Sequence, residues 1–417
     1  NKKDIMSPSV LICAVYFIST ICAVYNIETW DIDLHFNTYF IIIVGLLAFI
    51  LTECFVNALS RKKILFVNNL KATADTPIYI KNGKTLLIIF FDIVVIYLFF
   101  KEVYRISLLV GNPENFMMMM NYYRYIASYS TSLLAEEGIS TIVSQLTKIV
   151  CVAAYVYLFV FIYNVVYIKD KITKNLKFLL PVIMYIVLIL LGAARSGLLY
   201  LMAAALVLSY IMFQRRTGWR VNISFKYTKI GLICMVAFLI TFSYLRGFVG
   251  RLSEANTIDY VTSYAGGSIQ LLDMYLQNPP VNDGHFGSET FIGLQRLFYK
   301  LGLSNYQRLY HLEFRTSGSL TGNVYTALRR YYQDFGLFGM AVCQVMLAFI
   351  YSYFYNRIKR QKIYNSNSNY WLIVYLMIIP GIFMHSLTDN FYGEMLSLGW
   401  LIKFVLLRPV YWFLVDV

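Results

Sequence analysis

Arginines stand at several places in the sequence where a positive charge is costly, and they indicate an anion-binding site. Arg195 interrupts an apolar stretch over residues 178–213, and Arg246 and Arg251 follow another apolar block. An arginine inside a bilayer costs roughly 2.5–3.5 kcal/mol on insertion scales, so it requires a partner, either a nearby acid or a bound anion. The guanidinium fork binds diphosphate oxygens in pairs and stays charged, so a diphosphate is the anion we expect. The arginines expected to bind it are Arg195, Arg246, Arg251 and Arg296.

Three side chains are candidates for a catalytic base that removes a proton from a hydroxyl group: His285, Asp334 and His385. Such a base must lie within hydrogen-bond reach of the proton that it takes. The alternative for each histidine is a hydrogen-bonded structural role. The alternative for Asp334 is a salt bridge with Arg330, because residues four apart lie on one face of a helix. The sequence contains no metal-binding motif, and we predict neither a metal nor a cofactor.

Membrane-spanning helices are the elements that must position these residues. The chain has 417 residues, of which 59% are hydrophobic and 14% charged, and its mean hydropathy is +0.60. Soluble domains contain about 45–50% apolar and about 25% charged residues. This composition excludes a soluble enzyme, a disordered chain and a coiled coil. All 6 cysteines fall inside apolar blocks, so neither a disulfide framework nor a zinc site is supported.

Apolar blocks of helical length follow one another along the whole chain. A crossing needs about 20 residues, because a rise of about 1.5 Å per residue must cover a hydrocarbon core of about 30 Å. We therefore predict an all-α polytopic integral membrane protein, a single membrane domain over residues 1–417 with about ten transmembrane helices. The predicted crossings are residues 7–26, 37–57, 85–104, 143–168, 178–194, 196–213, 228–246, 335–356, 370–387 and 395–414.

The charged residues predict which connections face the cytoplasm. The chain carries 36 Lys and Arg against 22 Asp and Glu, a net charge of +14. The basic residues concentrate in alternate connections, around residues 61–84, 169–177, 215–229 and 357–362. Basic connections stay in the cytoplasm, so an even number of crossings places both termini there. Topology thus accounts for the basic excess, and no nucleic-acid partner is needed.

Two connections on the opposite side are long. Residues 105–142 are predicted to form a short helix in the membrane interface, either a packed cap or a gate for a lipid-borne substrate. Residues 247–334 are long enough to form a periplasmic subdomain. Within it, apolar residues at helical spacing predict a helix over 258–276 that ends at two prolines. A second helix is predicted from an N-cap at Ser288 to a stop near Gly302.

A short pattern at the end of the second long connection resembles a known family. The segment TGNVYTALRRYYQDFGLFG, residues 321–339, is similar to a pattern of the bacterial O-antigen polymerases, the Wzy-type oligosaccharide repeat-unit polymerases. In that family the late outer loop often re-enters the membrane through such a pattern. The GAARSG turn around Arg195 and the general layout extend the resemblance over nearly the whole chain. The matching residues are Asn323, Tyr325, Tyr332, Asp334, Phe335, Gly336 and Gly339.

This resemblance implies a fold, an activity and a location. The fold would be similar to the C-superfamily membrane glycosyltransferases, which use lipid-linked donors. The activity would transfer a growing glycan from undecaprenyl diphosphate to a lipid-linked oligosaccharide repeat unit, as in O-antigen synthesis. The location would be the periplasmic face of the bacterial cytoplasmic (inner) membrane. The partners would be the two undecaprenyl-diphosphate-linked substrates, membrane lipids and a chain-length regulator protein, with no nucleic acid.

The candidate arginines and the candidate bases would each have one role in this reaction. Arginines at the outer surface would stabilise the departing diphosphate, and one of the candidate bases would deprotonate the acceptor hydroxyl. Asn323 and Tyr325 are expected to contact the sugar from one wall of the site. Asn323 is also expected to cap a helix that continues through residues 335–356 without a break, since no proline intervenes.

Other classes of membrane protein remain alternatives. O-antigen ligases share this layout, so a ligase or another lipid-sugar transferase is the first alternative. A flippase or another transporter would show inverted halves with broken helices in matching positions, whereas this chain has one large, lopsided outer connection. A non-catalytic scaffold would leave the outer arginines unexplained.

Overall fold

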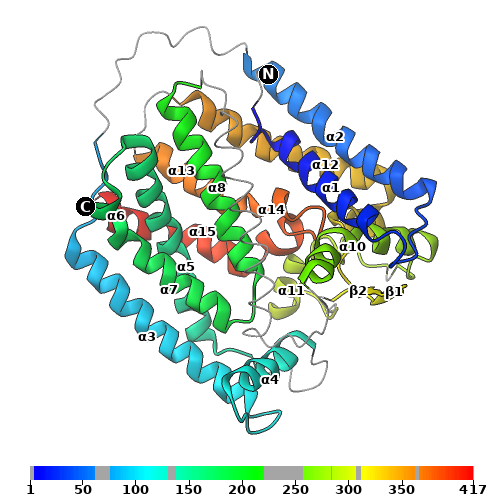
Figure 1. Cartoon of the computed structure of the whole chain (residues 1–417), viewed down its shortest axis with the longest axis horizontal. Coiled ribbons are helices and arrows are strands. Elements are labelled where there is room, and N and C mark those ends of the chain that lie inside the picture. Colours follow the sequence, from blue (N-terminus) through cyan, green and yellow to red (C-terminus); the bar gives the residue numbers. More distant parts are fainter. Residues whose placement is uncertain are drawn as a thin grey trace. The chain divides into compact units, whose positions relative to one another are not determined.

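The computed structural model shows a protein built almost entirely from helices, with one two-stranded hairpin (Figure 1). The predicted crossing 228–246 and the candidate site residues Arg246 and Arg251 lie outside the described residues. The chain divides into two compact units, one of residues 1–73 and 258–401, the other of residues 74–257 and 402–417. The structure describes residues 4–61, 76–129, 138–219, 257–282, 284–306, 311–361 and 366–416.

The first unit contains two long helices that pack side by side, α2 (Phe36–Arg61) and α12 (Ala327–Arg360), drawn in blue and orange in Figure 1. Strands β1 (Arg315–Ser317) and β2 (Leu320–Gly322) pair antiparallel, with Arg315 opposite Gly322. The other elements of this unit are α1 (Pro8–Tyr25), α10 (Thr257–Gln277), α11 (Ile292–Lys300), β1 (Arg315–Ser317), β2 (Leu320–Gly322), α13 (Ser366–Ile378), α14 (Pro380–Phe383), the π-helical turn η5 (Phe391–Met395) and the start of α15 (Leu398–Tyr411).

The second unit is a helical bundle in which α3 (Asn82–Ser107), α5 (Thr141–Ile162) and α7 (Leu179–Leu191) pack against one another. Helix α4 (Phe116–Tyr129) confirms the helix predicted within residues 105–142, and Met119, Met120 and Tyr123 bury its apolar face against α3. The remaining elements are η3 (Tyr163–Ile168), α6 (Ile172–Asn175), η4 (Leu176–Phe178), α8 (Ser196–Arg216) and η6 (Trp412–Asp416).

Within the described residues, seven helices are long and apolar enough to cross a membrane, which identifies a helical, polytopic, membrane-embedded chain. The predicted block 85–104 lies within α3. The predicted crossing 370–387 is divided, because α13 ends at Ile378 and α14 begins at Pro380, whose ring nitrogen has no hydrogen to donate. The seven are Pro8–Tyr25, Phe36–Ser60, Thr141–Ile168, Ile172–Leu191, Ser196–Arg216, Ala327–Arg360 and Leu398–Val415.

In the first unit, the connections sort to the two ends of the helices. Lys359 Nζ, near the end of α12, lies 2.5 Å from Asp4 Oδ2, and Asn356 contacts Asn57, near the end of α2. At the other end, the hairpin is held against the loop between α1 and α2, where Ser317 Oγ donates to the carbonyl of Trp30 over 2.6 Å. Asp4 and the basic end of α12 therefore lie together, at the end of the helices opposite the hairpin.

In the second unit, the basic connections also meet at one end. Lys84 Nζ donates to the carbonyl of Phe413, and Lys177 Nζ donates to Asn82 Oδ1 over 2.6 Å. Arg216 reaches the carbonyl of Val166. These contacts bring the connections before α3, before α7 and after α8 together at one end of this unit.

Candidate functional site

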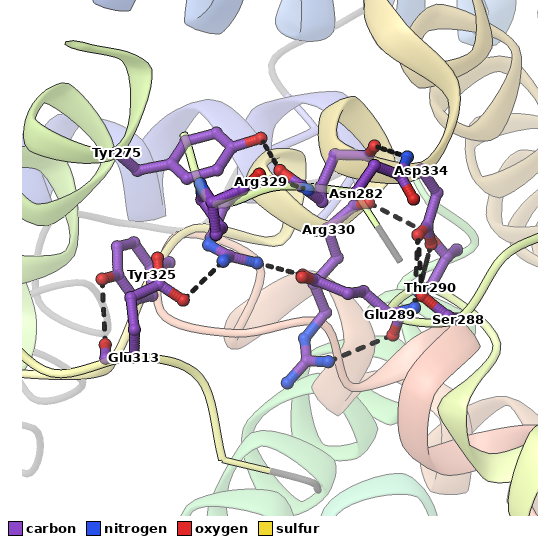
Figure 2. A network of polar contacts seen from close by, with 12 residues as sticks. Tyr275, Asn282, Ser288, Glu289, Thr290, Glu313, Tyr325, Arg329, Arg330 and Asp334 are labelled. Atoms are coloured by element: carbon purple, nitrogen blue, oxygen red, sulfur yellow. Dashed lines mark hydrogen bonds and ion pairs between the residues drawn. The ribbon is translucent and has the colours of Figure 1, made fainter. Parts of the chain in front are cut away.

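Arg329 forms the centre of a buried polar cluster at the start of α12 (Figure 2). Its side chain has no exposed area. One terminal nitrogen, Nη1, contacts Glu289 Oε2, and the other, Nη2, lies 2.7 Å from Glu313 Oε2. The guanidinium carbon lies 4.6 Å from the ring centre of Tyr275 and 4.8 Å from that of Tyr325. The arginine therefore joins three separate segments to the first turn of α12.

The charges in this cluster compensate one another. Burial by itself would raise the pKa of Glu313, but the charge and hydrogen bond of Arg329, together with the charge of Arg315 and a backbone hydrogen bond, outweigh it and hold the pKa below its usual range. Glu289 is fully buried with its carboxylate on the same guanidinium. Breaking such a pair from one side leaves an uncompensated buried charge. Arg329 therefore has a structural role, because carboxylates bind both of its terminal nitrogens.

Asp334 is engaged by backbone groups. Its Oδ2 accepts hydrogen bonds from the backbone N–H of Glu289 at 3.1 Å and of Thr290 at 2.6 Å, as Figure 2 shows. Arg330, which was predicted to pair with it, donates from Nη1 to the carbonyl of Glu289 over 3.1 Å. The predicted salt bridge is replaced because residues 288–290 pass close to this turn of α12 and present unsatisfied N–H groups. This geometry favours a structural role for Asp334.

The break in α12 lies at Gly336, and the prediction of an uninterrupted helix is wrong. Gly336 has φ 63° and ψ −167°, a conformation that is essentially restricted to glycine. The turn folds Phe335 back toward Gly339, where a Cβ would overlap that of Phe335. The ring of Phe335 then lies 5.0 Å from Phe286 and 6.0 Å from Phe291, measured between ring centres. Each residue of the D-F-G-x-x-G pattern therefore has a structural reason.

Asn323 and Tyr325 lie in the loop before α12. The helix begins at Ala327 with Thr326 as its N-cap, so the expected cap at Asn323 is wrong. Asn323 Nδ2 donates to the carbonyl of Leu312 over 3.4 Å. Tyr325 is 2% exposed and its hydroxyl donates to the carbonyl of Glu313 over 3.0 Å. The Tyr325 ring is therefore part of the buried cluster, where no open face remains for a sugar.

The two candidate histidines have opposite surroundings. His385 is buried, with Nδ1 3.1 Å from the Tyr16 hydroxyl and Nε2 2.8 Å from Gln344 Nε2. Both ring nitrogens are thus engaged inside the helices. His285 is exposed and its ring is stacked on Tyr306, with 3.9 Å between the ring centres. Of the two candidate histidines, His285 is therefore the one whose ring is accessible from outside the protein.

The candidate anion-binding arginines belong to different units. Arg195 lies in the turn between α7 and α8, where Ala193 adopts φ 53°, so the predicted tight turn is confirmed. Its side chain is buried. Arg296 lies in α11 of the first unit and is half-buried. The expected grouping of Arg195 with Arg246 and Arg251 stays a prediction.

Two buried acids are not among the predicted site residues. Glu289 pairs with Arg329. Asp389 is buried and accepts a hydrogen bond from the Tyr331 hydroxyl at 2.9 Å and from the backbone N–H of Gly393 at 3.0 Å. Burial raises the pKa of Asp389 to about 6, although Arg330 opposes the shift. The sequence signal that could have indicated these buried acids is the pair of consecutive arginines, Arg329 and Arg330, at the start of an apolar helix.

The helix prediction for residues 258–276 is confirmed by α10, which ends at Gln277 before the prolines. The second predicted helix is confirmed as α11, but it begins at Ile292 rather than after Ser288. The reason is that residues 288–290 are held in a turn by Asp334. A search of protein-family models, of curated proteins and of solved structures finds no match to this chain.

Proposed function

We propose that this protein is a membrane glycosyltransferase, a polysaccharide polymerase of the O-antigen type that uses a polyprenyl-diphosphate-linked donor. The observation that carries the proposal is the corner at Gly336. The motif residues Asp334, Phe335 and Gly339 fix the residues 257–326 segment to a membrane-spanning helix there. An enzyme with lipid-linked substrates needs this arrangement, because the sugar must meet the protein just above the bilayer.

The proposed reaction joins two lipid-linked substrates. A hydroxyl of the acceptor repeat unit attacks the anomeric carbon of the donor glycan, a new glycosidic bond forms, and the bond to the diphosphate oxygen breaks. The hydroxyl proton passes to a base, and undecaprenyl diphosphate leaves as an anion. We assign the base to His285, the exposed candidate. We assign the leaving-group charge to arginines, with Arg296, which belongs to the same unit as His285, as the first candidate among the described residues.

The distribution of charge supports a periplasmic site for this reaction. In the first unit, Lys359 and Asp4 lie at the end opposite the hairpin. Basic ends of membrane helices stay in the cytoplasm. The residues 257–326 segment, and His285 within it, would then face the periplasm of a bacterial inner-membrane protein with both termini in the cytoplasm.

The test is polymer formation in a host from which the gene has been deleted and then restored on a plasmid. We expect the deletion to leave single repeat units on the cell surface, and the restored gene to return the polymer ladder on a gel. His285→Gln should reduce the ladder to single repeats with a normal amount of protein in the membrane. His311→Gln, which changes another exposed histidine of the same segment, is the matched control and should keep the ladder.

Other outcomes would assign other functions. Free lipid-linked polymer in the deletion strain would indicate a ligase, and loss of all outward-facing glycan would indicate a flippase. A normal ladder from His285→Gln would remove His285 from the catalytic role. Arg296→Lys tests the anion site separately, because an ammonium cannot reproduce the bidentate fork of a guanidinium.

A further inference from the structure

The loop between α10 and α11 is fastened to the end of the first part of α12. Gln333 Nε2 donates to the carbonyl of Pro280 over 3.1 Å, and Asn282 Nδ2 donates to the carbonyl of Gln333 over 3.0 Å. At the far side of the loop, Asp334 accepts the backbone N–H of Thr290, as shown in Figure 2. Both ends of the loop are therefore hydrogen-bonded to two consecutive residues of α12, Gln333 and Asp334.

Between these two ends, apolar side chains of the loop are exposed on the protein surface. Phe286 is 78% exposed and Val281 is 95% exposed. The ring of Phe286 contacts Phe335 just before the break in α12, and Phe338 just after the break is 84% exposed. Leu337 is exposed as well. We call Phe286, Phe335, Leu337 and Phe338 the aromatic corner.

The outer face of α12 indicates what covers the aromatic corner. Downstream of Phe338, exposed apolar side chains recur every three or four residues along this candidate membrane-spanning helix. This spacing places them on one face of the helix. In a bilayer such a face contacts acyl chains, and the corner continues it at the end that carries the loop. The residues of the face are Phe338, Val342, Val345, Met346, Phe349 and Tyr353.

We propose that the aromatic corner inserts into the bilayer and that phospholipid acyl chains cover it. Helix α12 alone would not supply Phe286, because this residue belongs to the loop between α10 and α11. The contacts of Gln333 and Asp334 hold that loop in place. The loop thereby anchors the residues 257–326 segment at a fixed depth. This inference does not depend on the proposed glycosyl transfer.

Photo-crosslinking in the full-length chain tests the proposal. The photoreactive residue p-benzoylphenylalanine replaces one phenylalanine at a time, and the protein is irradiated in lipid nanodiscs of a single phospholipid and analysed by mass spectrometry. Phe286 is the test position. Phe349, on the outer face of α12, is the positive control, and Phe314, an exposed phenylalanine beside the hairpin, is the negative control.

We expect phospholipid adducts at 349 and 286 and none at 314. An adduct at 349 alone would overturn the proposal, since it would place Phe286 in water. Equal adducts at 286 and 314 would also overturn it, because lipid contact would then not be specific to the corner. An absence of adducts at all three positions would overturn the lipid-facing assignment of α12 on which the proposal rests. Each variant replaces one exposed phenylalanine by the same larger aromatic side chain, so the three positions can be compared directly.

Discussion

Replacing Arg329 by methionine removes the centre of the buried cluster at the start of α12. The substitution leaves Glu289 fully buried without its guanidinium. The half-buried Glu313 loses its ion pair with Arg329 and keeps the one with Arg315. Removing one partner of a buried pair costs about 3–5 kcal/mol. A loss of 1 kcal/mol lowers the melting temperature of a unit of this size by about 2–4 °C. We therefore expect Arg329→Met to lower the melting temperature by about 6–20 °C.

The assay is thermal unfolding in detergent, followed by tryptophan fluorescence. Trp30 is a suitable reporter, because it is buried in the same core as Tyr275 and Tyr325. The control is Arg105→Met, which removes an exposed arginine paired with Glu102 three residues away. Exposed pairs contribute about 0–1 kcal/mol, so the control should unfold close to the wild-type temperature.

A double variant separates loss of charge compensation from loss of packing. Adding Glu289→Gln to Arg329→Met removes the buried charge that the single variant leaves behind, so part of the stability should return. If Arg329→Met unfolds at the same temperature as Arg105→Met, the guanidinium is not buried between carboxylates and the account of the cluster is wrong. If the double variant is less stable than Arg329→Met, uncompensated charge is not the cause of the loss.

Two further predictions concern the corner and the start of α2. Gly336→Ala should destabilise the protein by about 1–3 kcal/mol, because alanine cannot adopt its backbone conformation without strain; Gly83→Ala, at a helical glycine with open space around it, is the control and should be near neutral in the same melts. The pKa of His35 is raised by its hydrogen bond to Asp273 and by the charge of that carboxylate, so this contact stabilises the fold below the ordinary histidine pKa and the contribution is lost as the pH rises through the raised value. The melting temperature should therefore fall between about pH 6 and 8 in the wild type and stay level in His35→Gln; an unchanged slope in the variant would assign the pH effect to another group.

The sequence determined the membrane character and most of the helices. Long apolar blocks and their lengths are local properties, so α1, α2, α5 and α8 could be predicted from hydropathy, and α10 from its apolar spacing. The small residues around Arg195 predicted the turn there for the same reason. The alternation of basic connections also anticipated which connections share an end of the helices.

The tertiary structure decided what the individual polar residues do. Arg329 and Glu289 are 40 residues apart, and their pairing depends on the path of the chain between them, which hydropathy does not encode. Helical spacing predicts that Asp334 pairs with Arg330. In the structure, the turn at 288–290 supplies the backbone N–H groups that bind the Asp334 carboxylate. The break at Gly336 followed from that contact and from Phe335 packing on Gly339. A residue type fixes which contacts are chemically available, and the fold selects among them because a buried polar group must find its partner wherever the chain brings one.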